Sequence, residues 1–168
     1  MKILNRVLLA LLITLALDRL TKLGAEQALL RRVPVSVIGQ YVQLTLDYNT
    51  GVSFGMFANG GVWLLALTSL IIAGLVVWLL IALHTRQLLS AAAWPAGMIL
   101  GGAIANFGDR LVDGRVTDFL DFGISTVRWP TFNFADSFIM VGIGLLMVIS
   151  LFQKGAAQIP YEQNDPNA

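Results

Sequence analysis

The chain has 168 residues, of which 57% are hydrophobic and 12% are charged, and its formal net charge is +1. Because an ordinary soluble domain has roughly 25% charged residues, this composition excludes a typical soluble globular protein and a disordered one. The balanced charge provides no basic surface for nucleic acid, and a chain with no cysteine and a single histidine, His84, is unsuited to thiol catalysis, Ser-His-Asp catalysis and multi-His metal sites.

Four apolar segments are long enough to cross a membrane as helices, which takes about 20 residues each. They cover residues 7–25, 61–83, 88–109 and 134–153. The first segment has an alternative interpretation as a cleavable signal peptide, with Lys2 and Arg6 as its charged start. Because three more apolar segments follow, we expect it to be the first helix of a single integral membrane domain.

Two connecting regions are longer than simple turns. In residues 33–57, apolar side chains at positions 42, 44, 46 and 48 alternate with polar ones, which predicts a half-buried β-strand. Open strand edges do not occur in lipid, so we expect this β-rich region outside the membrane. We interpret residues 111–132 as a loop, because Gly114, Gly123 and Pro130 interrupt its strand-like residues.

An even number of spans places both long connecting regions on one side of the membrane and both termini on the other. Lys and Arg residues near the span ends are equally numerous on the two sides, so their count does not give the orientation by the positive-inside rule. Lys2 and Arg6 precede the first helix and favour termini in the cytoplasm. Residues 155–168 form a short polar tail to which we assign no role.

Charged side chains inside a predicted span are costly and usually face a partner or a cavity. Asp18 and Lys22 are four residues apart with the acid first, which puts them on one helical face in the favourable order. Two interpretations stay open for them, an intrahelical ion pair near the membrane surface and a polar face turned toward a substrate.

The third apolar segment ends in Asn106, Asp109 and Arg110, whose spacing places them on one face. A small-residue surface with Gly101, Gly102 and Ala105 precedes them and allows close helix packing. A structural ion pair at a helix end explains Asp109 and Arg110 alone, but it does not explain why glycines, an amide and an ion pair coincide.

Asp118 and Asp136 are candidates for an acid–base pair, because adjacent helices bring them to the same membrane face. Two close carboxyl groups share one proton near neutrality, so one can activate water while the other donates to a peptide carbonyl. The alternatives are an ordinary loop carboxylate at Asp118 and helix capping at Asp136, with Asn133 as the N-cap. Asp113 and Asp121 are rival carboxylates in the same loop.

Residues 49–55, Asn-Thr-Gly-Val-Ser-Phe-Gly, follow the predicted strand. The Asn49 amide is suited to hydrogen-bonding an extended peptide backbone, and Gly51 permits a tight turn. A plain turn is the alternative interpretation.

Five elements, in this order along the chain, resemble those of the signal peptidase II family of bacterial intramembrane aspartyl proteases. They are Asp18-Arg-Leu-Thr-Lys22, residues 49–55, residues 101–110, Val116-Thr-Asp-Phe119 and residues 129–137. One departure is Ala105, where the family usually has glycine; since alanine is also small, we expect slightly looser packing there and no loss of activity.

The resemblance implies an all-α polytopic membrane protein with four transmembrane helices and a small β-cradle on the periplasmic side of the inner membrane. It implies an endopeptidase that removes signal peptides from prolipoproteins, cutting before a cysteine that carries diacylglycerol, without a metal or a cofactor. By resemblance, the catalytic pair is Asp118 and Asp136. Positions matching substrate or inhibitor binding are Asn49, Gly51, Asn106, Asp109, Arg110, Asn133 and Ala135, with Asp18 and Lys22 in support.

The partners that the resemblance implies are lipid-modified prolipoprotein, membrane lipid and cyclic peptide inhibitors of the globomycin type, with the chain as a monomer. The alternative function is a small proton- or ion-coupled transporter, which would carry carboxylates near the bilayer midplane and often inverted repeats. A non-catalytic assembly subunit is a further alternative, and it would tolerate Asp to Asn changes at both candidate positions.

Overall fold

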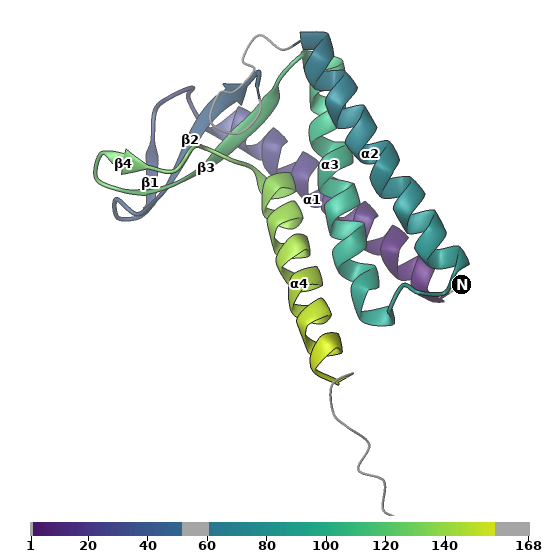
Figure 1. Cartoon of the computed structure of the whole chain (residues 1–168). Coiled ribbons are helices and arrows are strands. Elements are labelled where there is room, and N and C mark those ends of the chain that lie inside the picture. The colour runs from purple at the N-terminus through teal and green to yellow at the C-terminus, as the bar shows by residue number, and fades with distance from the viewer. Residues whose placement is uncertain (1, 52–60, 157–168) are drawn as a thin grey trace, which may run out of the picture.

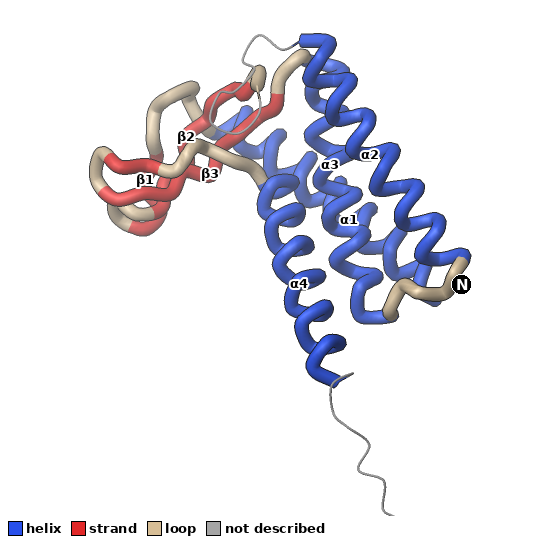
Figure 2. The backbone as a smooth tube through the Cα atoms, viewed as in Figure 1, coloured by secondary structure: helices blue, strands red, loops and turns tan. Residues whose placement is uncertain are grey.

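The computed structural model describes residues 2–51 and 61–156, which form four α-helices and a four-stranded antiparallel sheet (Figure 1). The elements in chain order are α1 (Lys2–Ala28), β1 (Val35–Ile38), β2 (Val42–Asn49), α2 (Gly61–His84), the 3-10 turn η2 (Ser90–Ala92), α3 (Ala93–Asp113), β3 (Val116–Ile124), β4 (Val127–Arg128) and α4 (Phe134–Ala156). The sheet lies to one side of the helices, at the end where α4 begins (Figure 2).

Each of the four predicted apolar segments corresponds to one α-helix. By length and composition, α2 and α4 qualify as membrane spans over Val62–His84 and Phe134–Gln153. The other two helices are more polar, since α1 contains Asp18 and Lys22 within its length. The third helix begins later than predicted, at Ala93, because η2 precedes it.

The interpretation of residues 111–132 as a loop is wrong for most of its length. Residues 116–124 form β3, which lies between β2 and β4 in the strand order β1-β2-β3-β4. Strand β3 is covered on both faces, with Val116 and Phe119 both buried. The sheet is therefore a larger part of the fold than the expected all-α class with a small cradle implies.

The strict alternation predicted for β2 is interrupted by a shift in its pairing with β3. Leu44 pairs with Leu120, whereas Asp47 pairs with Asp118, so β2 has one extra residue between these two points. A bulge of this kind turns the following side chains to the opposite face of the sheet. As a result Asp47 lies on the same face as Asp118, together with Asn49 two residues farther along β2.

Helix α3 occupies the centre of the bundle and packs against the other three helices (Figure 1). Glycines make these approaches close. A Cβ at Gly101 would lie 2.9 Å from Cβ of Thr14 in α1, and a Cβ at Gly102 would lie 2.5 Å from the carbonyl oxygen of Ala135 in α4. The two adjacent glycines thus face two different helices, which explains the small-residue surface that the sequence predicted.

Candidate active site

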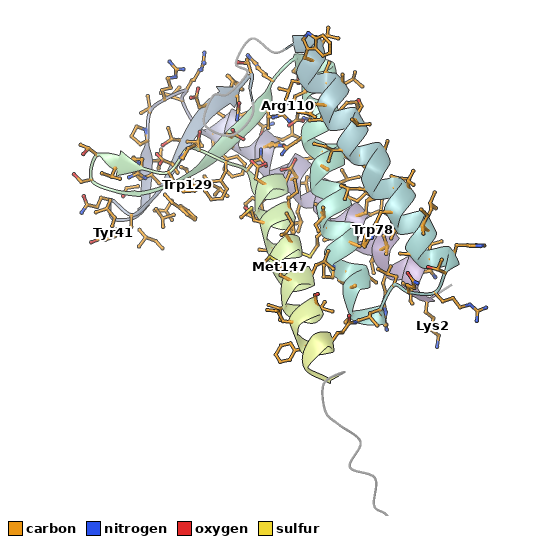
Figure 3. The ribbon with its side chains drawn as sticks, in the orientation of Figure 1. Lys2, Tyr41, Trp78, Arg110, Trp129 and Met147 are labelled. Carbon is orange, nitrogen blue, oxygen red and sulfur yellow. The ribbon has the colours of Figure 1, made fainter. Side chains whose placement is uncertain are left out.

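Asp118 of β3 and Asp136 of α4 line the same cavity, which has a volume of about 1120 Å³. It lies where the sheet meets the first turn of α4, close to the end of α3 that carries Arg110 (Figure 3). Two carboxyl groups that are 18 residues apart in the sequence therefore lie at one cavity.

The Asp118 carboxyl group is 2% exposed and accepts hydrogen bonds from two amides. Asn133 Nδ2 donates to its Oδ1 at 2.7 Å, and Asn49 Nδ2 donates to its Oδ2 at 3.2 Å. Burial, followed by the neighbouring Asp136 carboxylate, raises the pKa of Asp118 to about 7. Asp118 is thus able to keep a proton near neutral pH.

Asp136 caps the helix and also reaches the cavity, so the two interpretations considered for it are compatible. Its backbone N–H donates to Asn133 Oδ1 at 2.9 Å, and its Oδ2 accepts from the Asn133 backbone N–H at 3.4 Å, as in a capping box. Its other oxygen, Oδ1, accepts from Asn106 Nδ2 at 2.8 Å. A carboxylate in the first turn of a helix is stabilised in its ionised form by the helix dipole.

The two carboxyl groups are linked by a bridge of two side-chain amides. Asn133 Nδ2 donates to Asp118 and, at 3.1 Å, to Asn106 Oδ1, while Asn106 Nδ2 donates to Asp136. Asn106 is 7% exposed and Asn133 is fully buried. Because each amide both donates and accepts, the bridge fixes how the two carboxyl groups face each other.

Lys22 holds the bridge from the side of the helix bundle. Its Nζ lies 2.6 Å from Asp18 Oδ2, 2.7 Å from Asp109 Oδ2 and 3.0 Å from Asn106 Oδ1. Lys22 is 1% exposed, and among the described residues these three partners compensate its charge. The i, i+4 ion pair predicted from the sequence is present, and it faces the site through Asn106.

Asp18 has a second contact that joins α1 to the start of α4. Its Oδ1 accepts from the Ala135 backbone N–H at 2.8 Å, one of the unpaired donors of the first helical turn. Ala135 is fully buried, so a small side chain is required there for α1 and α4 to approach.

Arg110 connects α3 to the end of β2. Its Nη2 donates to the Gly51 carbonyl oxygen at 2.9 Å, and its Nη1 donates to the Asn106 carbonyl oxygen at 3.2 Å. The Gly51 N–H donates to Asn49 Oδ1 at 2.9 Å, which forms a local turn. Of the seven predicted binding positions, Asn49 and Gly51 line the cavity itself, whereas the other five lie behind its wall; residues 52–55 of the predicted motif lie outside the described residues.

The two rival carboxylates are not part of this cavity. Asp121 lies on the opposite face of β3 from Asp118, where it accepts from Arg128 Nε at 2.6 Å and from Thr45 Oγ1 at 2.7 Å. Asp113 is exposed at the end of α3. Of the four candidate carboxylates, Asp118 and Asp136 line the cavity, and Asp113 and Asp121 do not.

One polar contact behind the site was missed by the sequence analysis. Thr117, next to Asp118, donates to Glu26 Oε1 of α1 at 2.6 Å. Glu26 lies four residues after Lys22 and eight after Asp18, so the same helical spacing extended by one turn would have identified it.

Aspartic peptidases use two carboxyl groups that share one cavity. Here Asp118 has a pKa near 7, and Asp136 lies at the start of a helix. The sequence profile of the family described as signal peptidase (SPase) II matches residues 10–152. The chain belongs to this family, whose members are aspartic peptidases that process prolipoproteins.

Individual relatives agree with this assignment. A lipoprotein signal peptidase of Gloeobacter violaceus is 36% identical over 155 residues, which cover 90% of this chain and 85% of that protein. One from Paraburkholderia phytofirmans is 40% identical over 142 residues, covering 83% of this chain and 81% of its own. A solved structure of a bacterial membrane enzyme matches with a TM-score of 0.77 at 23% identity, covering 93% of both chains, and supports the fold.

Proposed function

We propose that Asp118 and Asp136 form the catalytic pair of this signal peptidase II, and that it cuts prolipoproteins immediately before a diacylglyceryl-modified cysteine. The observation that carries the proposal is the amide bridge, because Asn106 and Asn133 hold two carboxyl groups of unlike environment at one cavity. No other carboxylate of the described residues shares that cavity except Asp47, which is bonded to arginines of the neighbouring segment.

In the proposed mechanism the two aspartates have different roles. Asp136, ionised at the start of α4, takes a proton from a water molecule that attacks the scissile carbonyl carbon. Asp118, still protonated near pH 7, donates its proton to the carbonyl oxygen as the tetrahedral intermediate forms. The proton on Asp136 then passes to the leaving nitrogen, and Asp118 recovers its proton as the carbonyl re-forms, so no covalent intermediate or cofactor is required.

The remaining predicted residues divide into two proposed roles. Asn49 and Gly51 line the cavity, and we assign them to the extended peptide on either side of the scissile bond. Asn106, Asp109, Arg110, Asn133 and Ala135, with Asp18 and Lys22, hold the pair and the end of β2 in position.

The proposed membrane arrangement is a single domain with four spans in the bacterial inner membrane. The sheet joins the helices at the C-terminal ends of α1 and α3 and the N-terminal end of α4, which are the same end of the bundle. We assign this end to the periplasm and both termini to the cytoplasm, with a monomeric chain, membrane lipid around it and globomycin-type peptides as inhibitors. A transporter is disfavoured, because the carboxyl pair lies at the end of α4 and on the sheet.

The test is cleavage of a diacylglyceryl-modified prolipoprotein by the purified chain in detergent, followed as a gel shift. Asp118→Asn and Asp136→Asn are compared with Asp113→Asn, the matched control, because Asp113 is an exposed carboxylate outside the cavity. We expect both dyad variants to fold and to lose activity, and the control to cleave at the wild-type rate. Wild-type activity in either dyad variant would refute the assignment of the pair.

A further inference from the structure

A second cavity, here called the lateral groove, lies between α2 and α4 with α3 as its floor. Its volume is about 460 Å³, and its walls include Leu75 and Trp78 of α2, Ala103 of α3, and Ile139 and Ile143 of α4. All of the side chains that line it are apolar. Figure 1 shows α3 between α2 and α4, the three helices that contribute its lining residues.

The lateral groove adjoins the cavity that Asp118 and Asp136 line. Ile139 lines both of them. Asp136, Ile139 and Ile143 are spaced by three and four residues, so they form one face of α4. Asp136 and Ile143 are about 10 Å apart along the axis of α4, so the groove begins beside the cavity and lies farther from the start of the helix.

We propose that the lateral groove holds one acyl chain of the substrate's diacylglyceryl group. This inference rests on the proposed function, because the lipidated cysteine adjoins the scissile bond, so its acyl chains leave the substrate beside the dyad. The wall formed by Asp136, Ile139 and Ile143 provides an apolar path that starts there.

The size of the groove favours an acyl chain over the signal-peptide helix. Along α2 it extends from Ile71 to Leu79, a length of about 12 Å. A helix of that length and of about 10 Å diameter occupies about 900 Å³, roughly twice the volume of the groove. A single hydrocarbon chain is narrower and requires no polar partner, which matches walls that are entirely apolar.

The surrounding lipid is as apolar as the walls of the groove, so an acyl chain gains little binding free energy by entering it. The effect of the groove is to orient the substrate. A chain seated there fixes the cysteine and hence the scissile carbonyl relative to the dyad. Displacing reacting groups by about 1 Å can cost about a hundredfold in rate. Blocking the groove should therefore reduce cleavage of long-chain substrates while leaving the dyad intact.

The experiment compares two synthetic prolipoproteins, one with dipalmitoylglyceryl cysteine and one with dihexanoylglyceryl cysteine, using the full chain in lipid nanodiscs. Ile143→Trp fills the groove two turns from the dyad, and Ala103→Phe fills it from the floor. Val141→Trp is the matched control, because Val141 is 52% exposed on α4 and lines neither cavity.

We expect both groove-filling variants to lose about tenfold or more in kcat/KM for the long-chain substrate, with less than twofold change for the short-chain one. The control should cleave both as wild type does. Equal loss for both substrates, or no loss for either, would overturn the proposed acyl site. Failure of the wild type to cleave either substrate would instead refute the proposed function, so the two failures are distinguishable.

A second measurement identifies the occupant directly. A photoreactive group halfway along one acyl chain should crosslink to the groove residues Leu75 or Trp78 in the uncleaving Asp118→Asn variant, and excess unlabelled dipalmitoyl substrate should abolish the crosslink. Crosslinks confined to the sheet or to α1, or groove crosslinks that unlabelled substrate does not reduce, would place the chain elsewhere.

Discussion

The most informative single position is Asn133, because its side chain has two separable tasks. Its Oδ1 accepts from the Asp136 backbone N–H at 2.9 Å and caps α4, while its Nδ2 donates to Asp118 at 2.7 Å and to Asn106 at 3.1 Å. Asn133→Ala removes both tasks. Asn133→Ser keeps an N-cap oxygen but is too short to reach Asp118.

The expected magnitudes follow from these contacts. Loss of the cap costs about 1 kcal/mol of stability, and leaving the buried Asp118 carboxyl group without this partner costs about 1–3 kcal/mol. If the second amount is lost from the stabilisation of the transition state, kcat decreases by roughly 5- to 150-fold. We expect both variants to show this decrease, and Asn133→Ser to be about 1 kcal/mol more stable than Asn133→Ala.

The assay combines equilibrium unfolding in detergent with initial rates of prolipoprotein cleavage. Asn133→Gln provides an additional comparison, because it retains an amide that is one methylene too long for the bridge. Full activity in Asn133→Ser would show that the amide bridge does not align the dyad, and equal stability of the serine and alanine variants would refute the capping role.

Three further outcomes are expected. Cleavage should fall as the pH rises through about 7, because Asp118 then loses the proton that it donates. The pKa of Asp118 is higher in the folded than in the unfolded chain, so the free energy of unfolding should also decrease as the pH rises from about 4 to 7. Asp118→Asn should remove this part of the dependence of stability on pH. A flat pH–rate profile from pH 6 to 9 would contradict the assignment. Lys22→Met should cost about 3–5 kcal/mol, because it leaves buried carboxylates uncompensated; adding Asp18→Asn should recover part of the loss, and urea unfolding of the single and double variants measures both. Gly97→Ala should cost about 1–3 kcal/mol by overpacking, because its Cβ would lie 2.3 Å from the Val7 carbonyl oxygen, whereas Gly108→Ala, with nothing within 4 Å of its Cβ, should be nearly neutral in thermal melts.

The helices and the shared face of Asp18 and Lys22 could be predicted because their signals are local. Long apolar segments identify helices by composition, and the spacing of Asp18 and Lys22 identifies a shared face within one helix. Asp118 lies shortly after the third apolar segment and Asp136 lies at the start of the fourth, and both belong to motifs that resemble those of the family.

The sheet and the amide bridge could not be predicted in the same way. Pairing of Asp47 with Asp118 joins residues far apart in sequence, and the bulge that turns Asp47 and Asn49 toward the site has no local sequence signal. The amide bridge also depends on strand pairing. Phe132 pairs with Leu120, and this pairing brings the next residue, Asn133, beside Asp118. The loop interpretation of residues 111–132 failed because Gly114 caps the end of α3, Gly123 allows a close approach to Val127 of β4, and Pro130 follows the end of β4.

The two proposed catalytic carboxyl groups lie on elements with different surroundings. Asp136 lies in the first turn of α4, which is long and apolar enough to cross a membrane, whereas Asp118 lies on β3, which the proposed arrangement puts outside the hydrocarbon layer. Bilayers of different thickness change the tilt of helices that cross them, and a tilt of α4 would strain the two amides that join the helix to the sheet. The rate of cleavage should therefore vary with the chain length of the surrounding lipid, which makes the thickness of the host membrane a determinant of how quickly lipoproteins mature.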